Sequence, residues 1–345
     1  MTKTQKILIA ALLLQIGLAV LTFATTRSAG AGAGAKPFLG IKAADVTDLV
    51  IEAAAQEGGA PERIELAKKD GKWVVASGGD FPAKADKVEE LVKNLTELAV
   101  RDPISTQAAN HAELKVADQE FGRKVQIKAG AAEKTFFVGA GDGPGVHLRF
   151  ANEAAVYQSR GVSVWSVSAS ARTYVDTKYV EMDKDKLAAV TVQNAKGLLT
   201  FKKAGDSWTL AELPAGEAID ADKAKAFVAK AARLALEAPV GKEAKPEFGL
   251  GAGARVTLVG TADDKPKTLS YLVGAPADDK SFYAKADDSD FFVTVSKYAA
   301  EQLLDKAAAD FVKPKPKEGG DSDSEPVPGA DARPMPRPVP RFPQP

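Results

Sequence analysis

The stretch Lys69-Asp70-Gly71-Lys72-Trp73 places an Asp-Gly pair between two runs of residues that suit β-strands. Asp-Gly is typical of a two-residue hairpin turn, because both residues accept positive φ angles. A related stretch, Lys203-Ala204-Gly205-Asp206-Ser207-Trp208, follows later in the chain, and its Trp lies 135 residues after the first. The sequence therefore predicts that a unit of structure opening on a β-hairpin occurs twice.

A helical pattern follows each Trp and strengthens this interpretation. The apolar positions recur every three or four residues, which is typical of an amphipathic helix. They are Val88, Leu91, Val92, Leu95, Leu98 and Ala99 in the first helix and Ala224, Phe227, Val228, Ala231, Leu234 and Ala235 in the second, at a constant offset of 136. We expect helices at Asp86–Val100 and Asp222–Leu236, and Asp86 with Glu89 suggests a capping box at the first.

The remaining elements are short strands separated by turn residues, each unit ending in a further helix. In the first unit the expected strands are Val46–Ala54, Arg63–Lys68, Lys72–Ala76, Lys124–Lys128, Thr135–Val138, Val146–Phe150 and Ala155–Gln158, with a helix near Val162–Ala171. In the second they are Leu187–Gln193, Leu198–Lys203, Trp208–Leu210, Arg255–Val259, Thr268–Val273, Phe282–Ala286 and Phe291–Val295, with a helix near Tyr298–Ala308. Mainly antiparallel strands with about two helices per unit indicate an α+β fold.

The chain of 345 residues divides into five segments by composition. We expect a membrane anchor or signal segment at 1–28, a Gly/Ala linker at 29–40, the first repeat unit at 41–176, the second at 177–312, and a Pro-rich tail at 313–345. Ten of the 20 prolines lie at or after Pro314, and such a composition predicts a disordered or polyproline II tail.

The first segment predicts export from the cytoplasm. Residues 7–24 are apolar except for Gln15 and Thr22, and they follow Lys3 and Lys6. Such a run suits a single membrane-spanning helix with its N-terminus in the cytoplasm, although cleavage as a signal peptide in the region of residues 29–35 remains an alternative. We therefore expect the protein in the bacterial inner membrane, with the bulk of the chain in the periplasm.

Composition excludes several classes of function. Lys plus Arg and Asp plus Glu both total 46, so the net charge predicts no binding of nucleic acid. The absence of Cys excludes disulfides, thiolate metal sites and a Cys nucleophile. No familiar nucleophile motif or phosphate-binding loop motif is present. We expect no cofactor and no catalytic, cofactor-binding or metal-binding residues.

Four features invite a functional interpretation, and a structural one is favoured for each. His111 and His147 are the only histidines, and their counterparts in the second unit, Glu247 and Phe282, are not histidines. The glycine-rich stretch 139–145 precedes a strand rather than the helix that a dinucleotide site needs. The stretch Asp287-Asp288-Ser289-Asp290 lacks the spacing of a calcium loop and suits a solvated turn. Trp73 and Trp208, at one repeat position, suit the core better than a sugar platform.

Several of these motifs together resemble the bacterial family named for the domain of unknown function 4340. They are Asp45-Val46-Thr47-Asp48-Leu49-Val50-Ile51, Gly71-Lys72-Trp73, Phe248-Gly249-Leu250, Val138-Gly139, Val273-Gly274 and Ala155-Val156-Tyr157. The resemblance covers residues 41–312 and implies two tandem copies, although Ala112-Glu113-Leu114 lacks the aromatic-Gly pair. It implies an envelope protein accessory to an ABC-type, gliding-related export system, and it supplies no catalytic residue.

We expect an exported, membrane-tethered binding or scaffolding module that has a protein partner in the envelope and is not an enzyme. Duplication adds surface without preserving an active site, and Arg337 and Arg341 beside the prolines of the tail suit an acidic partner. Two alternatives remain open. One is an envelope hydrolase that uses carboxylates alone, which needs no sequence motif. The other is a structural spacer whose tail reaches another envelope layer.

Overall fold

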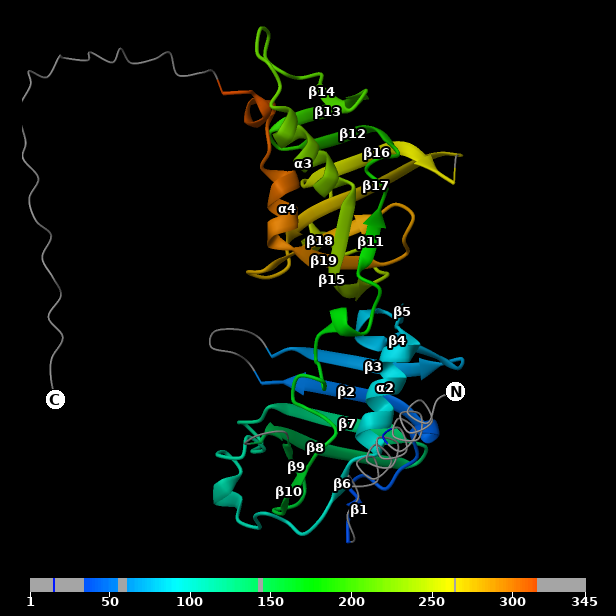
Figure 1. Cartoon of the computed structure of the whole chain (residues 1–345), viewed down its shortest axis with the longest axis vertical. Coiled ribbons are helices and arrows are strands. Elements are labelled where there is room, and N and C mark those ends of the chain that lie inside the picture. Colours follow the sequence, from blue (N-terminus) through cyan, green and yellow to red (C-terminus); the bar gives the residue numbers. More distant parts are fainter. Residues whose placement is uncertain (1–14, 16–33, 55–60, 142–144, 264, 315–345) are drawn as a thin grey trace, which may run out of the picture.

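The computed structural model describes Gln15 and residues 34–54, 61–141, 145–263 and 265–314. The expected membrane segment, apart from Gln15, and the tail from residue 315 lie outside this part of the chain. Within it, no helix has both the length and the apolar character needed to cross a membrane. The described residues form two large antiparallel sheets and three α-helices, and the sheets follow each other along the long axis of the molecule (Figure 1).

The N-terminal unit is built on an eight-stranded sheet in the order β10-β9-β8-β7-β2-β3-β4-β5. A short pair, β1 with β6, adjoins β10, where the hydroxyl of Ser159 donates to the carbonyl oxygen of Ala99 at 2.8 Å, and a separate bridge joins Ser105 to Val156. The strands are β1 (Lys36–Pro37), β2 (Val46–Ala53), β3 (Arg63–Lys69), β4 (Lys72–Val75), β5 (Phe81–Pro82), β6 (Ala99–Val100), β7 (Arg123–Ala129), β8 (Ala132–Ala140), β9 (Val146–Phe150) and β10 (Val156–Ser159). The helices are α2 (Ala85–Thr96) and the 3₁₀ turns η1 (Ala43–Asp45), η2 (Ala76–Gly78), η3 (Ala108–Asn110) and η4 (Ala171–Thr173).

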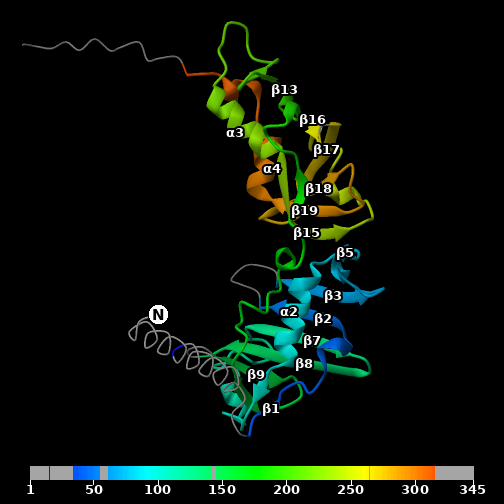
Figure 2. The same cartoon turned by 45° about the vertical axis from the view of Figure 1, so that its right-hand side comes forward.

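The C-terminal unit is built on a nine-stranded sheet in the order β11-β15-β19-β18-β17-β16-β12-β13-β14. The strands are β11 (Lys178–Glu181), β12 (Leu187–Asn194), β13 (Gly197–Ala204), β14 (Ser207–Leu210), β15 (Arg233–Gly241), β16 (Ala254–Ala262), β17 (Lys265–Pro276), β18 (Ser281–Ala286) and β19 (Phe292–Ser296). The helices are α3 (Ala221–Ala231), α4 (Lys297–Leu304) and the 3₁₀ turns η5 (Pro246–Phe248) and η6 (Ala308–Phe311). Figure 2 shows α3 and α4 together beside this sheet.

The two units place their strands in the same order. The run β10-β9-β8-β7-β2-β3-β4 of the first sheet corresponds to β19-β18-β17-β16-β12-β13-β14 of the second. The pair β1 and β6 occupies the place of β11 and β15, although it forms a separate two-stranded sheet, which contacts β10 through the bond from Ser159 to Ala99. Trp73 on β4 and Trp208 on β14 hold corresponding places, and both are buried as expected, at 4% and 6% exposed.

Each helix buries the apolar stripe predicted for it. Val88, Leu91, Val92 and Leu95 of α2 are buried, as are Ala224, Phe227, Val228 and Ala231 of α3. Phe38 and Leu39, which the composition places in the linker, are also buried in the N-terminal unit. Most buried apolar side chains of both units form one continuous cluster, so the units share a core, while Val116, Phe137 and Val156 form a small cluster of their own.

A tight joint connects the units where β5 and η2 meet β15. The rings of Phe81 and Phe291 contact each other edge to face, with centroids 4.8 Å apart. Arg172 on η4 forms an ion pair with Glu237 on β15. A Cβ at Gly79 would lie 2.8 Å from the Cα of Gly241, so only a residue without a side chain allows this approach of the two backbones.

The predicted helices end too late, because strands begin inside them. α3 ends at Ala231 rather than at Leu236, and β15 begins at Arg233. Leu234 and Leu236 are buried while Arg233 and Ala235 are exposed, which is the alternation of a strand. Leu234 satisfies the helical and the strand periodicity alike, so the apolar pattern alone does not separate them. The N-terminal unit shows the same change from α2 to β6.

Two further predictions about helices are wrong. Residues 162–171 contain turns rather than an α-helix, although Val162, Val167 and Ala169 are buried. The capping box at Asp86 is absent, because α2 begins one residue earlier and its N-cap, Lys84, has no side-chain hydrogen bond. The predicted closing helix of the C-terminal unit is present as α4, which ends at Leu304.

The aromatic-Gly pair Phe248-Gly249 of the second unit has a counterpart in the first unit, but it lies two residues after Ala112-Glu113, where the sequence predicts it. A Cβ at Gly274 would lie 2.0 Å from the carbonyl oxygen of Phe248, and one at Gly139 would lie 2.1 Å from that of Leu114. Leu114-Lys115 therefore takes the place of Phe248-Gly249. Lys115 has a φ of 55° where Gly249 has 58°, so the lysine adopts the left-handed conformation that glycine accepts more easily.

Candidate functional site

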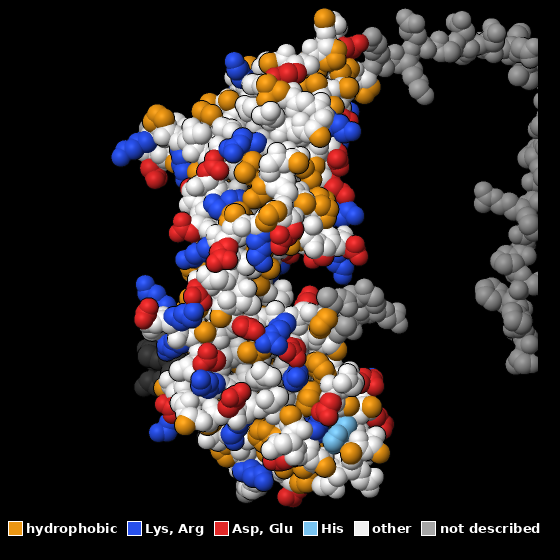
Figure 3. All heavy atoms as spheres, turned by 180° about the vertical axis from the view of Figure 1, so that it is seen from behind, with side chains coloured by type: hydrophobic (Ala, Val, Ile, Leu, Met, Phe, Trp, Pro, Cys, Tyr) orange, Lys and Arg blue, Asp and Glu red, His pale blue; other side chains and the backbone are white. Residues whose placement is uncertain are grey.

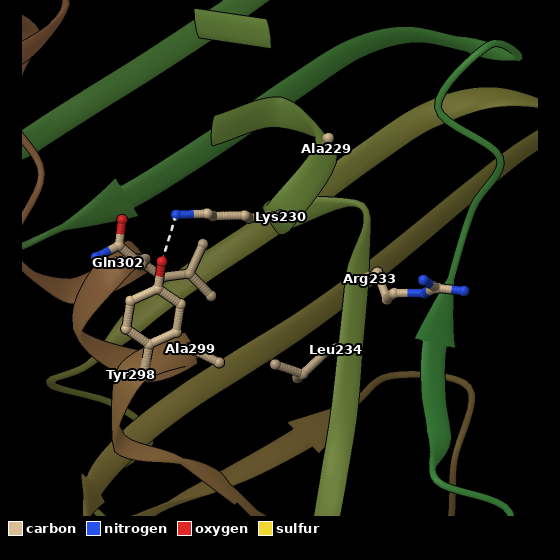
Figure 4. A pocket seen from close by; sticks show the side chains of 8 residues that line it. Ala229, Lys230, Arg233, Leu234, Tyr298, Ala299 and Gln302 are labelled. Atoms are coloured by element: carbon tan, nitrogen blue, oxygen red, sulfur yellow. Dashed lines mark hydrogen bonds between the residues drawn. The ribbon is translucent and has the colours of Figure 1, made fainter. Parts of the chain in front are cut away.

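The most distinct apolar hollow in the described part of the chain lies between α3, α4 and the start of β15. Its volume is about 280 Å³. We call it the α3–α4 groove, and it is lined by Ala229, Lys230, Arg233, Leu234, Tyr298, Ala299, Gln302 and Leu303. Figure 4 shows Lys230 and Tyr298 facing each other from α3 and α4, with Leu234 on the same side of β15 and Arg233 pointing to the other side of that strand. The groove stays open because alanines face it at positions 229 and 299.

The two helix ends that form the groove are fixed by capping and by the sheet. The hydroxyl of Ser296 accepts a hydrogen bond from the backbone N–H of Ala299 at 3.3 Å and so caps the N-terminus of α4. At the C-terminus of α3, the hydroxyl of Tyr271 donates to the carbonyl oxygen of Ala231 at 2.7 Å. Tyr271 is fully buried on β17, and this burial raises the pKa of its phenol well above its ordinary value.

Tyr298 and Lys230 face each other across the groove. The ammonium of Lys230 donates to the hydroxyl of Tyr298 at 2.7 Å, and its nitrogen lies 4.9 Å from the centre of the ring (Figure 4). Tyr298 is 62% exposed, which is high for an aromatic side chain in the first turn of a helix that packs on a sheet. Exposed aromatic side chains next to a charged group are typical of protein interaction sites.

The third wall of the groove is formed by the start of β15, whose residues the apolar pattern of the sequence assigns to a helix. Leu234 is buried at its base, and Arg233 lies at its rim. The guanidinium of Arg233 pairs with Glu181 on β11 at 2.5 Å. Hydrogen bonds from Lys178, and then from Arg233, lower the pKa of the Glu181 carboxyl below its ordinary value. Arg233 is therefore held in place, whereas Lys230 has no carboxylate partner among the described residues.

The composition of the lining suits the binding of an apolar group. Its lining contains no carboxylate and no imidazole, and its floor is formed by alanine and leucine. An aliphatic side chain or a proline ring of a partner would fill the floor and contact the face of Tyr298, and an acidic group beside it would reach Lys230. No local pattern in the sequence indicates this site, because α3 and β15, which follow each other in the chain, meet a helix, α4, from a distant segment, and Lys230 and Tyr298 are 68 residues apart.

The two histidines have structural partners and lie apart from the groove. The Nε2 atom of His111 lies 2.9 Å from the carbonyl oxygen of Ala154, and the Nδ1 atom of His147 lies 3.2 Å from that of Leu114. Each ring thus connects two segments of the N-terminal unit. In the described residues no group of three or more histidines or carboxylates has the arrangement of a metal site.

The two loops with functional alternatives lie between strands, and residues 142–144 of the glycine-rich one are outside the described part of the chain. The glycine-rich stretch 139–145 joins β8 to β9, which pair antiparallel, so a strand follows it as expected. The acidic turn Asp287–Asp290 joins β18 to β19, and a lysine ammonium contacts its backbone. The ammonium of Lys285 donates to the carbonyl oxygens of Ala286, at 2.9 Å, and of Ser289. This contact favours a structural turn over a calcium loop.

Arg149, at the position of the N-terminal unit that corresponds to Lys285, likewise donates hydrogen bonds to backbone carbonyl oxygens of a turn. Its guanidinium donates to the carbonyl oxygens of Val116, Phe150, Ala151 and Glu153 and to the carboxylate of Asp118. Its side chain is 4% exposed, and it lies over the ring of Phe137. Each unit therefore uses one basic side chain to hold the turn after the corresponding strand.

The surface seen from behind is mixed in charge. Figure 3 shows Lys and Arg side chains interspersed with Asp and Glu over this face, with small apolar areas between them. Outside the groove, the large apolar side chains that are most exposed are scattered singly, as with Trp165 at 81% and Ile104 at 49%. Single exposed apolar residues are common on the surfaces of folded domains, whereas the groove brings several apolar side chains together in one hollow.

Comparison with known proteins gives one positive result. No curated protein and no solved structure matches the chain. The model of the family described as a domain of unknown function (DUF4340) matches residues 73–252. This single match begins at Trp73 on β4 and ends before β16, so it crosses from the N-terminal unit into the C-terminal one, and no second copy is shown. Because the match spans more than half of the 345 residues, the chain belongs to the family of the domain of unknown function DUF4340.

Proposed function

We propose that the protein is an exported, membrane-tethered binding module that holds a partner protein of the envelope in the α3–α4 groove. The observation that supports the groove most directly is Tyr298, an exposed aromatic side chain whose hydroxyl is held by Lys230 over an apolar floor. Aromatic side chains in apolar hollows with a charged rim contribute most to the affinity of protein interfaces. The partner's matching feature is an aliphatic or proline side chain next to a carboxylate.

The membrane tether is proposed from the sequence alone. Residues 7–24 have the length and apolar character of a short membrane span, and Lys3 and Lys6 favour an N-terminus in the cytoplasm. This orientation places both units on the periplasmic side of a bacterial inner membrane. An accessory role beside an ABC-type export system fits the resemblance to the family, and it assigns the groove to contacts with another component of that system.

We also propose that the two units are copies of one ancestral unit. The corresponding strand order, the paired Trp73 and Trp208, and the equivalent contacts of Gly139 and Gly274 support a duplication. The copies differ where the groove lies, because residues 162–171 form turns where the C-terminal unit has α4. On this proposal, the C-terminal copy acquired a binding site and the N-terminal copy serves as its support.

The test is co-purification of the full chain from detergent-solubilised membranes. Ala299→Trp fills the groove and Tyr298→Ala removes its aromatic wall, and we expect both to lose the same partner. Val259→Thr is the matched control, since Val259 is 41% exposed on β16 and lies outside the groove lining. Retention of every partner by both groove variants would contradict the proposal.

A further inference from the structure

The rim of the α3–α4 groove has an unbalanced positive charge. Arg233 is paired with Glu181, and Lys297 lies 3.8 Å from Glu301. Lys230 contacts only the tyrosine hydroxyl and ring of Tyr298 among the described residues, and Lys225, further along the exposed face of α3, has no ion pair there. An occupant with carboxylates would therefore gain favourable charge contacts with α3.

The described chain ends close to this helix. The backbone N–H of Lys313 donates to the carbonyl oxygen of Ala218 at 2.7 Å, just before α3 begins, and the N–H of Asp220 donates to that of Phe311. The chain continues for 31 residues after Pro314. It therefore leaves the C-terminal unit at the N-terminal end of α3, whereas the groove lies at the C-terminal end of the same helix.

The residues after Pro314 include a segment whose acidic and apolar side chains match the groove. The acidic residues Asp321, Asp323 and Glu325 are followed directly by Pro326-Val327-Pro328. An aliphatic side chain between two prolines matches an apolar floor beside a tyrosine ring, as in the recognition of proline-rich peptides by aromatic grooves. The final segment is a poorer match, because Arg337 and Arg341 would meet Lys230 and Arg233 with like charge.

The reach of the segment is sufficient. α3 has 11 residues, so its length is roughly 16 Å at a rise of about 1.5 Å per residue. The ten residues between Pro314 and Glu325 span roughly 31 Å even at the rise of polyproline II, about 3.1 Å per residue. The acidic segment can therefore follow the exposed face of α3 past Lys225 and bring Val327 to the groove.

We propose that the segment Asp321–Pro328 of this chain occupies the α3–α4 groove and competes with the partner for it. This inference rests on the proposed function, since it gives that site an internal competitor. Tethering makes the segment effective at a high local concentration without any requirement for tight binding. A partner that carries the same acidic and apolar pattern would displace it, so release of the segment would accompany partner binding.

The test uses disulfide formation in the full chain, which contains no cysteine of its own. The variant Gln302→Cys with Val327→Cys places one thiol in the groove lining and one in the segment, so only one disulfide can form within a molecule. The control pairs Gln302→Cys with Val339→Cys, in the arginine-containing end. We expect the first pair to close within one molecule about tenfold faster than the control, a difference that corresponds to ~1.4 kcal/mol. Chain length alone predicts only a small difference, because the cost of loop closure grows slowly.

A charge exchange separates docking from random contact. Asp323→Lys with Glu325→Lys should remove the advantage of the first cysteine pair, and adding Lys225→Glu with Lys230→Glu should restore it. Equal rates for the two cysteine pairs, or disulfides that form between molecules instead, overturn the inference. Either result leaves the proposed function standing if Ala299→Trp still loses the partner, so the two failures are distinguishable.

Discussion

Gly78 of the N-terminal unit lies so close to Pro239 of the C-terminal unit that a Cβ at position 78 would be 2.4 Å from the proline Cγ. The residue precedes Gly79, which makes a similar approach to Gly241. Two adjacent glycines thus allow η2 to contact β15, and the joint between the units depends on the absence of their side chains.

The first prediction concerns this joint. Gly78→Ala should reduce the free energy of unfolding by about 1–3 kcal/mol, because the added methyl group overpacks the contact with Pro239. The measurement is a urea titration followed by circular dichroism. Gly251→Ala is the control and should be near neutral, since a Cβ there has no neighbour within 4 Å. An equal loss in both variants would show that the joint is not the cause.

The second prediction concerns Lys115, which has the left-handed backbone that its counterpart Gly249 also adopts. Lys115→Gly should stabilise the protein by about 0.5 kcal/mol, because relief of the strained φ exceeds the entropy cost of glycine in the unfolded chain. The ion pair with Glu120 is exposed, so its loss subtracts little.

The reverse change at the corresponding position should have the opposite sign. Gly249→Ala should destabilise by about 1–2 kcal/mol, because it combines the left-handed strain with a Cβ placed 2.8 Å from that of Ala275. Thermal unfolding of both variants measures the pair. Destabilisation by Lys115→Gly would mean that the lysine side chain contributes more than its backbone costs.

The third prediction concerns the buried guanidinium of Arg149. Arg149→Met should cost about 3 kcal/mol, because it leaves carbonyl oxygens and the carboxylate of Asp118 without their donor. Arg149→Lys should recover roughly half of this loss, since Lys285 performs the same role in the C-terminal unit with an ammonium. Denaturant titration of both variants tests it, and equal losses would contradict the proposed equivalence.

The fourth prediction concerns alkaline pH. Burial raises the pKa of Tyr271 and of Tyr174, so the folded protein keeps protons that the unfolded chain releases above pH of about 10. Because the unfolded state then binds fewer protons, the free energy of unfolding should fall as pH rises beyond that value. The stabilising effect of these phenols is fully present at lower pH.

The tyrosine variants isolate this effect. Tyr271→Phe should lower stability at neutral pH by about 1 kcal/mol through the lost bond to Ala231, and it should make the decline above pH of about 10 less steep. Tyr174→Phe, which loses the bond to Ser168, should act in the same direction. Unfolding free energies measured across the alkaline range check both, and an unchanged slope in both variants would refute the assignment.

Much of the fold could be predicted from the sequence because its signals are local. The hairpin at Asp70-Gly71 is formed with φ angles of 49° and 77°, and the strands on each side have nearly the expected bounds. Strand β15 could not be predicted, since Leu234 and Ala235 are assigned to the helical stripe that precedes them, although Ala235 is exposed. The helix ends where the hydroxyl of Tyr271 and the backbone N–H of Met182, both from distant segments, donate to the carbonyl oxygens of Ala231 and Ala232 and so replace the bonds of a further helical turn.

The candidate site could not be predicted for a related reason. Tyr298 was expected on a helix, but nothing in its neighbourhood along the chain indicates that it faces Lys230. Exposure of an aromatic residue depends on what packs beside it, and here the facing helix α3 presents the small side chain of Ala229 to the groove. The histidines drew attention because of their chemistry, whereas the structure gives them backbone partners.

The order of the units along the molecule also has a mechanical consequence. β1 lies at one end of the long axis and η6 near the other, with the strands running mostly across that axis (Figure 1). A tension applied between the two ends of the described chain would therefore be carried from one unit to the other through the joint at Gly78 and Pro239. Because the strands run across the direction of the load, the hydrogen bonds between neighbouring strands would break one after another rather than all at once. Resistance to extension would therefore come from the packed joint and the shared core rather than from the sheets.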